Sequence, residues 1–404
     1  MSVLMRPVHR RQRWAVATIA VVAVVLLVLS LTASCARHRT GSAGPPSPSG
    51  SAPAPTAPAT SRPADPTGAW GWLPTAPLPA GSYGSVWTGR EMILYQPNLG
   101  DPNGSTTPTG SIAAAYNPTT GTWRTLPSSG LPVALMEGGW HPVWDGTEML
   151  TWGLMDAAYN PTTNRWRPLH ASPIYGAAIT VWTGSQVLMW GGGCCGGANA
   201  DGAAYTPATD TWQTMPPGPL SGRYTTGAWT GIELLIAGGQ APVENGVFAD
   251  AAAYNPLTRT WRTLPPMPKP RTDATVTWTG TEVLVVGGHA ATLGTGYADA
   301  LAYNPTTNRW RQPSTMDSTR MRHVAVWTGT RLLVWGGQTA QGRAPDHGLA
   351  YDPATDRWTT LPPSVLRGRT GANAVWTGHA MLIWGGITIL NPTLCTDGAA
   401  YVPA

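Results

Sequence analysis

Short apolar and β-branched runs, separated by tight turns, organise most of this chain. In residues 270–313 the run Thr275–Trp278 is followed by a Thr-Gly-Thr turn and then by residues 283–286, V-L-V-V. Two such runs joined by a glycine turn predict a β-hairpin. Residues 300–303 and the segment around Trp310, which an Asn-Pro turn separates, predict a third and a fourth strand. We therefore expect this unit to form a four-stranded antiparallel sheet.

The same unit recurs seven times along the chain. A phrase close to V-W-T-G alternates with a second phrase, A-Y-N-P-x-T-x-x-W, and the last three intervals between first-phrase tryptophans are 49 residues each. The first phrase contains Trp87, Trp144, Trp182, Trp229, Trp278, Trp327 and Trp376, and the second contains Tyr116, Tyr159, Tyr205, Tyr254, Tyr303, Tyr351 and Tyr401. A period near 50 residues with four strands per repeat predicts an all-β fold, a seven-bladed β-propeller.

Repeats three to seven add a Gly-Gly pair after the second run, as in Gly287-Gly288, ahead of the tyrosine and the tryptophan. Repeats one and two lack this pair but keep the other two phrases. The order Gly-Gly, Tyr, Trp resembles the kelch motif. Residues 68–404 as a whole resemble a kelch-repeat β-propeller of the kelch and galactose-oxidase-type superfamily.

The two ends of the repeat region complement each other. The seventh repeat has its third strand at Tyr401 but no fourth-strand tryptophan. Near the other end, Gly71-Trp72-Leu73-Pro74 looks like residues 261–265, W-R-T-L-P. We therefore expect an N-terminal strand carrying Trp72 to complete the last blade and close the ring, which removes the exposed sheet edges.

The first 67 residues have a different composition. Residues 1–35 combine four arginines with an apolar run from Ala15 to Leu31 and a lipobox-like Cys35, as in a signal peptide or membrane anchor. Three alternatives stay open: lipidation of Cys35, an uncleaved anchor, and simple cleavage. Residues 36–67 are rich in Pro, Ser and Ala and predict a disordered tether. All three alternatives place residues 68–404 on the extracytoplasmic side of the cell membrane or, after cleavage, in the secreted fraction.

The formal net charge of +5 belongs to the leader. Without the seven arginines and one aspartate of residues 1–67, residues 68–404 keep 18 basic and 19 acidic residues, a net charge of −1. Nucleic-acid binding requires a basic footprint on the folded domain. The sequence therefore predicts no nucleic-acid partner.

Candidate ligand-binding residues lie before the first strand of the later repeats. Arg271, Arg320 and Arg369 each precede the first-phrase tryptophan by seven residues, and Arg223 precedes Trp229 by six. Variable loops on a rigid scaffold usually carry specificity, so we expect an arginine arc at the channel mouth. Its other predicted members are Arg322, His289 and His323. Arginine forks suit carboxylates and phosphates, which points to an anionic sugar or an acidic peptide. The alternative is that these arginines bond neighbouring loop carbonyls.

Four aspartates and three cysteines complete the list of polar candidates. Asp201, Asp250, Asp299 and Asp397 each precede a repeat tyrosine by four residues, and this register predicts that they cap the Gly-Gly amides of their own blades. A vicinal disulfide between Cys194 and Cys195 is favoured over a cross-ring bridge to Cys395. We find no zinc-ligand spacing, no catalytic constellation and no cofactor motif.

These features favour a cell-surface binding module whose partner is an extracytoplasmic protein or glycan. The resemblance keeps an enzymatic alternative open. Proteins similar to N-acetylneuraminate epimerase share the size and an arginine-lined mouth, which would give Arg271, Arg320 and His323 the leading roles. Copper radical oxidases of the galactose-oxidase type need two tyrosines, two histidines and a crosslinked cysteine, and no spacing here reproduces that set.

Overall fold

A computed structural model describes residues 68–100, 109–133, 141–174, 176, 178–193, 197–242, 246–290 and 296–404. Within these ranges the chain forms 28 β-strands arranged in seven four-stranded antiparallel sheets. Residues 67–404 make up one compact unit. The predicted seven-bladed propeller is therefore confirmed, whereas the predicted anchor and tether lie outside the described residues.

The first four blades each use four consecutive strands. Blade 1 contains β2 (Gly84–Trp87), β3 (Met92–Pro97), β4 (Ser111–Asn117) and β5 (Thr122–Thr125). Blade 2 contains β6 (Val143–Trp144), β7 (Met149–Thr151), β8 (Ala157–Asn160) and β9 (Arg165–Pro168). Blade 3 contains β10 (Ile179–Trp182), β11 (Val187–Trp190), β12 (Gly202–Thr206) and β13 (Thr211–Thr214). Blade 4 contains β14 (Gly227–Trp229), β15 (Leu234–Ala237), β16 (Ala251–Asn255) and β17 (Thr260–Leu264).

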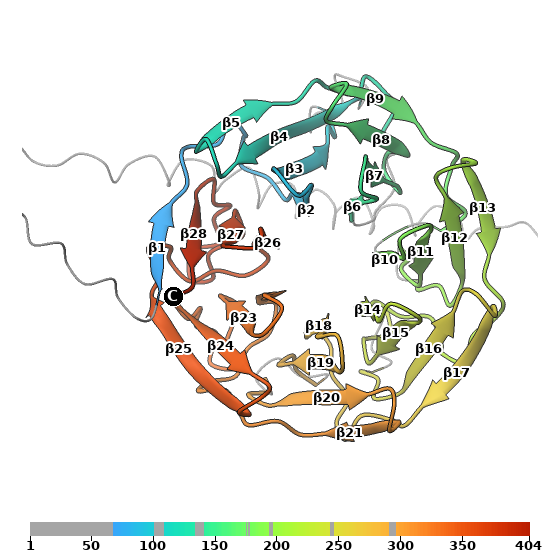
Figure 1. Cartoon of the computed structure of the whole chain (residues 1–404), viewed down its shortest axis with the longest axis vertical. Coiled ribbons are helices and arrows are strands. Elements are labelled where there is room, and N and C mark those ends of the chain that lie inside the picture. The colour runs from blue at the N-terminus through green and yellow to red at the C-terminus, as the bar shows by residue number, and fades with distance from the viewer. Residues whose placement is uncertain are drawn as a thin grey trace, which may run out of the picture. The chain divides into compact units, whose positions relative to one another are not determined.

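The last three blades include the one that joins the two ends of the propeller. Blade 5 contains β18 (Thr275–Trp278), β19 (Val283–Val286), β20 (Ala300–Asn304) and β21 (Arg309–Arg311). Blade 6 contains β22 (Val324–Trp327), β23 (Leu332–Trp335), β24 (His347–Asp352) and β25 (Arg357–Pro363). Blade 7 contains β26 (Asn373–Trp376), β27 (Met381–Trp384), β28 (Gly398–Val402) and β1 (Ala69–Trp72). Figure 1 shows the first strands lining the central channel and the fourth strands forming the outer rim.

The regular spacing of the motif within each repeat places its residues side by side on the four strands of a blade, where they pair with one another. In blade 5, Trp278 pairs with Val283, Val283 with Tyr303, and Tyr303 with Trp310. The ring centroids of Tyr303 and Trp310 are 5.1 Å apart. The fixed spacing in the sequence thus places equivalent side chains at equivalent depths in every sheet.

The hydrophobic core is divided among the seven interfaces between neighbouring blades. Leu235 of blade 4 and Val283 of blade 5 belong to one such cluster, and Leu382 of blade 7 and Met92 of blade 1 belong to another. Second strands such as β19 are buried at all four positions because a neighbouring blade covers each face. This explains why these strands read as continuous apolar runs rather than as alternating ones.

Strand β1 closes the ring as predicted, but through a different tryptophan. Trp70, not Trp72, pairs with Tyr401, and its ring centroid lies 5.0 Å from that of Tyr401. Trp72 is 59 % exposed. The prediction was shifted by two residues, which keeps the side chain on the same face of the strand but moves it away from the motif residues that pair across the blade.

A ring of indole hydrogen bonds joins the blades at the rim. In each blade the outer-strand tryptophan donates its Nε1–H to a backbone carbonyl in the outer strand of the preceding blade or just after it. The seven pairs are Trp123 to Pro74, Trp166 to Pro127, Trp212 to His170, Trp261 to Pro216, Trp310 to Pro265, Trp358 to Ser314 and Trp70 to Pro362. Trp70 is therefore the member of this ring that fastens the N-terminal strand to blade 6.

Candidate functional site

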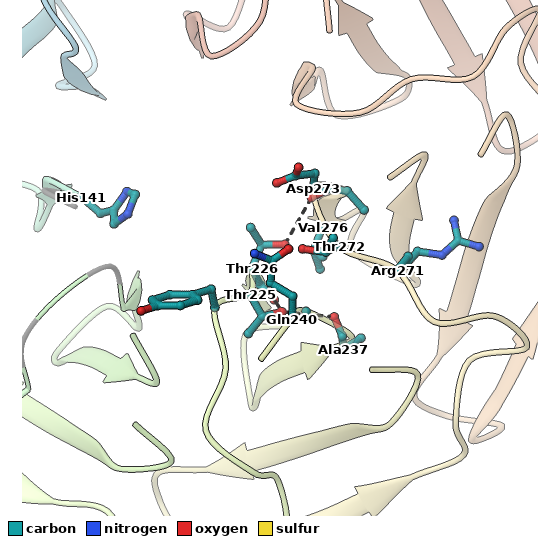
Figure 2. A pocket seen from close by; sticks show the side chains of 12 residues that line it. His141, Thr225, Thr226, Ala237, Gln240, Arg271, Thr272, Asp273 and Val276 are labelled. Atoms are coloured by element: carbon teal, nitrogen blue, oxygen red, sulfur yellow. Dashed lines mark hydrogen bonds between the residues drawn. The ribbon is translucent and has the colours of Figure 1, made fainter. Parts of the chain in front are cut away.

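The four arginines of the predicted arc lie inside the propeller. Arg223, Arg271, Arg320 and Arg369 are between 0 and 2 % exposed. In each, Nη1 donates to the carbonyl of the first glycine of its own Gly-Gly pair, as in the 2.9 Å bond from Arg271 to Gly287. Figure 2 shows the Arg271 side chain directed away from Thr226 and Asp273. These groups bond loop carbonyls, the alternative that the sequence left open, and of the four only Arg271 belongs to the lining of the pocket described below.

Carboxylates neutralise three of these buried guanidinium groups within their own blades. Arg223 pairs with Asp250, Arg271 with Asp299 at 3.1 Å, and Arg369 with Asp397. The predicted capping of the Gly-Gly amides by these aspartates is confirmed, but the backbone of the aspartate makes the bond and not its carboxylate. The Gly-Gly amide is held by the aspartate's backbone carbonyl, as in the 3.0 Å bond from Gly238 N to Asp250 O. The side chain is left free to meet the arginine.

In blade 6 the carboxylate that pairs with the buried arginine comes from a different position in the chain. His347 occupies the position that aspartate has in blades 3, 4, 5 and 7, four residues before Tyr351. The carboxylate comes instead from Asp317, whose Oδ1 lies 3.6 Å from Arg320 Nη2 and whose Oδ2 lies 2.8 Å from His347 Nε2. Burial lowers the pKa of Arg320, and the neighbouring carboxylate opposes that shift.

Both predicted histidines are buried. His323 is 6 % exposed, and its Nε2 lies 2.9 Å from the hydroxyl of Thr275. Burial, followed by the charge of Arg320, lowers the pKa of His323 to about 3, so its imidazole is neutral at physiological pH. His289 is 5 % exposed and lies 3.1 Å from Asp273 through Nε2.

Arg322 is the one predicted arginine whose side chain reaches solvent. Its side chain is 55 % exposed, and its Nε donates to Asp273 Oδ2 at 2.7 Å. Asp273 lies in the segment that enters blade 5, and Arg322 in the segment that enters blade 6. The pair therefore joins blades 5 and 6 just before their first strands, which line the channel.

A pocket of about 210 Å³ lies at the channel wall between blades 4 and 5. Thr226 and Gln240 contribute from blade 4, Thr272 and Asp273 from blade 5, and His141 from the segment that enters blade 2. Figure 2 shows the Asp273 carboxylate directed into an open space, with His141 on its far side. The segments that meet here precede the first strands or follow the second strands. These are the variable loops that the sequence assigned to one face.

The pocket contains polar groups with unused hydrogen-bonding capacity. Gln240 is exposed, and its side-chain amide makes no hydrogen bond with the described residues. Asp273 accepts from Arg322 and His289 through Oδ2 alone, so Oδ1 has no partner in the same part of the chain. Sequence reasoning missed both residues. Asp273 could have been found from its position two residues after Arg271, where Arg322 follows Arg320.

The remaining candidates contribute little to this pocket. Cys35, Cys194 and Cys195 lie outside the described residues, so the lipidation and disulfide predictions stay predictions. Cys395 is buried, and its Sγ lies 3.6 Å from the carbonyl oxygen of Thr393. Among the described residues, no three His, Cys, Asp or Glu side chains are grouped so that they could hold a metal ion. The same residues include no helix long and apolar enough to cross a membrane.

Comparison with known families agrees with the fold. A family model described as the KLHDC2/KLHL20/DRC7 Kelch-repeats domain matches residues 176–386, more than half of the chain. The chain belongs to the kelch-repeat family. The matched part of this kelch propeller includes blades 4 and 5 with Thr226, Gln240 and Asp273. No curated protein matches the chain closely enough to suggest a ligand.

Proposed function

We propose that this kelch propeller is a non-catalytic binding module whose ligand site is the channel pocket between blades 4 and 5. The supporting observation is the pair of uncommitted polar groups there, the Gln240 amide and Asp273 Oδ1. A side-chain amide and a carboxylate that face the same pocket can bond adjacent hydroxyl groups of a sugar. We therefore propose a glycan ligand.

The size of the pocket limits what enters it. Pockets that enclose drug-sized ligands start at about 300 Å³, whereas this one is about 210 Å³. It suits one sugar ring rather than a long segment of chain. An acidic peptide, the other ligand class that the sequence suggested, would place a single side chain in this pocket.

The enzymatic alternative loses the residues on which it rested. Arg271, Arg320 and His323 are each at most 6 % exposed and are bonded within the blades. A general acid or base must reach the proton that it transfers. The residues on which the enzymatic alternative rested are therefore not placed for proton transfer, which supports the proposal of a binding module.

The binding proposal is tested by titrating the purified propeller with single-ring sugars and with an acidic peptide in a calorimeter. We expect Gln240→Ala to weaken sugar binding about tenfold, because it removes one or two hydrogen bonds. Gln338 follows the Gly-Gly pair of blade 6 as Gln240 follows that of blade 4, and it does not line the pocket. Gln338→Ala is the matched control and should leave the affinity unchanged. Equal losses in both variants would contradict the assignment of the pocket.

We further propose that residues 1–67 hold the propeller at the outer side of the cell membrane, through lipidated Cys35 or through the apolar run before it. Cys35→Ala separates these two cases. If lipid is the anchor, labelled palmitate should be incorporated into the unaltered protein and not into Cys35→Ala. If the apolar run spans the bilayer, neither protein should incorporate the label, and both should stay in the membrane fraction.

A further inference from the structure

Two residues beside the pocket have an unusual backbone conformation. Seven non-glycine residues in the described part of the chain have positive φ. Five of them occupy one recurrent turn, two residues before an outer-strand tryptophan: Asn164, Asp210, Arg259, Asn308 and Asp356. The other two are Asp273 and Arg322, both with φ of 55°. These follow the buried Arg271 and Arg320 by two residues.

Glycine satisfies the same backbone position elsewhere in the ring. Gly371 follows Arg369 by two residues in blade 7 and has φ of 61°. A side chain in the left-handed region is strained relative to glycine, and such strain is concentrated at functional sites. Blades 5 and 6 nevertheless carry an aspartate and an arginine here. Aspartate tolerates the left-handed region, so the arginine of blade 6 is the less expected of the two residues at this backbone position.

The two side chains form one polar unit, in which Asp273 lines the pocket and Arg322 is bonded to it. Besides the Nε to Oδ2 bond, Arg322 N donates to Asp273 O at 3.0 Å, which fixes the relative position of the two residues. Arg322 Nη1 and Nη2 make no hydrogen bond with the described residues, and Asp273 Oδ1 is likewise unused. The unit thus offers a pair of charged donors next to an anionic acceptor.

We infer that the ligand is a carboxylated sugar. Its carboxylate would meet the Nη1 and Nη2 edge of Arg322, the fork geometry that suits two carboxylate oxygens. A ring hydroxyl would donate to Asp273 Oδ1, and Gln240 would bond a neighbouring hydroxyl. This inference rests on the proposed function and adds the charge of the ligand to it.

The test compares glucuronate with glucose, which has the same ring without the carboxylate. At low salt we expect the propeller to bind glucuronate at least tenfold more tightly than glucose. Arg322→Gly should abolish that preference while glucose binding persists. The Arg322–Asp273 ion pair is partly exposed and contributes little to stability, and glycine relieves the backbone strain. The melting temperature of the variant should therefore not fall.

Arg259→Gly is the matched control. Arg259 has φ of 56°, is exposed, and lies in the turn that joins β16 to β17. This variant removes the same charge and the same strain away from the pocket, so the preference for glucuronate should persist. If Arg322→Gly lowers the melting temperature and leaves the preference intact, the pair has only a structural role and the inference is overturned.

The outcomes also separate this inference from the proposed function. Equal binding of glucuronate and glucose, with both weakened by Gln240→Ala, would overturn the carboxylate assignment and keep the binding module. Absence of binding to either sugar would overturn both proposals. Binding of an acidic peptide alone would replace the sugar as the ligand, and would overturn the inference in the same way.

Discussion

At the scale of single residues, burial decides what each polar group does. An arginine and an aspartate at recurrent positions look like a charged arc in the sequence, yet Arg223 and Arg369 are buried and paired. Their charges are satisfied inside the fold and are not offered to a ligand. Arg322, two residues after the buried Arg320, keeps its side chain in solvent.

Asp250→Ala tests the structural role of the buried pairs. The substitution leaves the Arg223 guanidinium buried without its carboxylate, and we expect it to lower the free energy of unfolding by about 2 to 3 kcal/mol. Asp201 occupies the equivalent position in blade 3, is exposed and makes no ion pair with the described residues. Asp201→Ala should therefore change stability by less than about 0.5 kcal/mol. Urea denaturation of both variants measures the difference.

His323 predicts a pH dependence with a definite sign. Its folded pKa of about 3 lies below the ordinary value of 6.5, so between these values the unfolded chain binds a proton that the folded chain does not. Stability should fall as pH drops below about 6.5, by about 1.4 kcal/mol per unit, or about 2 kcal/mol between pH 7 and pH 5. His323→Gln should lose this contribution. Equal pH sensitivity in both proteins would show that other groups account for the acid response.

At the scale of the element, the position of a residue in a strand is set by the residue of the neighbouring strand with which it pairs. In β1, Trp70 contacts Tyr401 and donates to Pro362, whereas Trp72, two residues further on, lies in solvent. A two-residue shift preserves the face of the strand, so the pattern of apolar residues cannot detect it.

The two tryptophans of β1 should therefore differ in their effect on stability. We expect Trp70→Ala to lower the free energy of unfolding by about 3 kcal/mol, because it empties a packed site and removes one hydrogen bond of the rim. Trp72→Ala should change it by less than about 0.5 kcal/mol. Thermal unfolding followed by tryptophan fluorescence compares them. A larger loss from Trp72→Ala would contradict the observed register.

At the scale of the whole molecule, stability depends on closing the ring. Each hydrophobic cluster lies between two blades, and the cluster between blades 6 and 7 includes Trp70 from the start of the propeller. The last interface is complete only when β1 pairs with β28 over Trp70 and Tyr401. Loss of this pairing would also expose a sheet edge in blade 7.

Two truncations test the boundary of the propeller. Removing residues 1–67 should leave the melting temperature unchanged, because residues 67–404 form one compact unit. Removing residues 1–74 should lower it sharply, because this deletion also removes β1 and the Pro74 carbonyl that Trp123 contacts. Calorimetry on both proteins gives the comparison, and equal melting temperatures would argue against ring closure through β1.

The sequence by itself determined the blades, their number and the strand that closes the ring. Residues that recur at a fixed spacing along the chain pair at equivalent positions in each sheet, so the repeat in the sequence reports the repeat in the fold. Tertiary structure decided which polar residues are available. Arg271 and Arg322 belong to neighbouring repeats and have the same chemistry, but one folds inward onto Gly287 and Asp299, and the other bonds Asp273 at the channel. That difference arises from how the loops of adjacent blades contact each other. Such contacts join segments that are far apart in the chain, and the spacing of the repeated motifs does not predict them. The pocket beside Asp273 exists for the same reason.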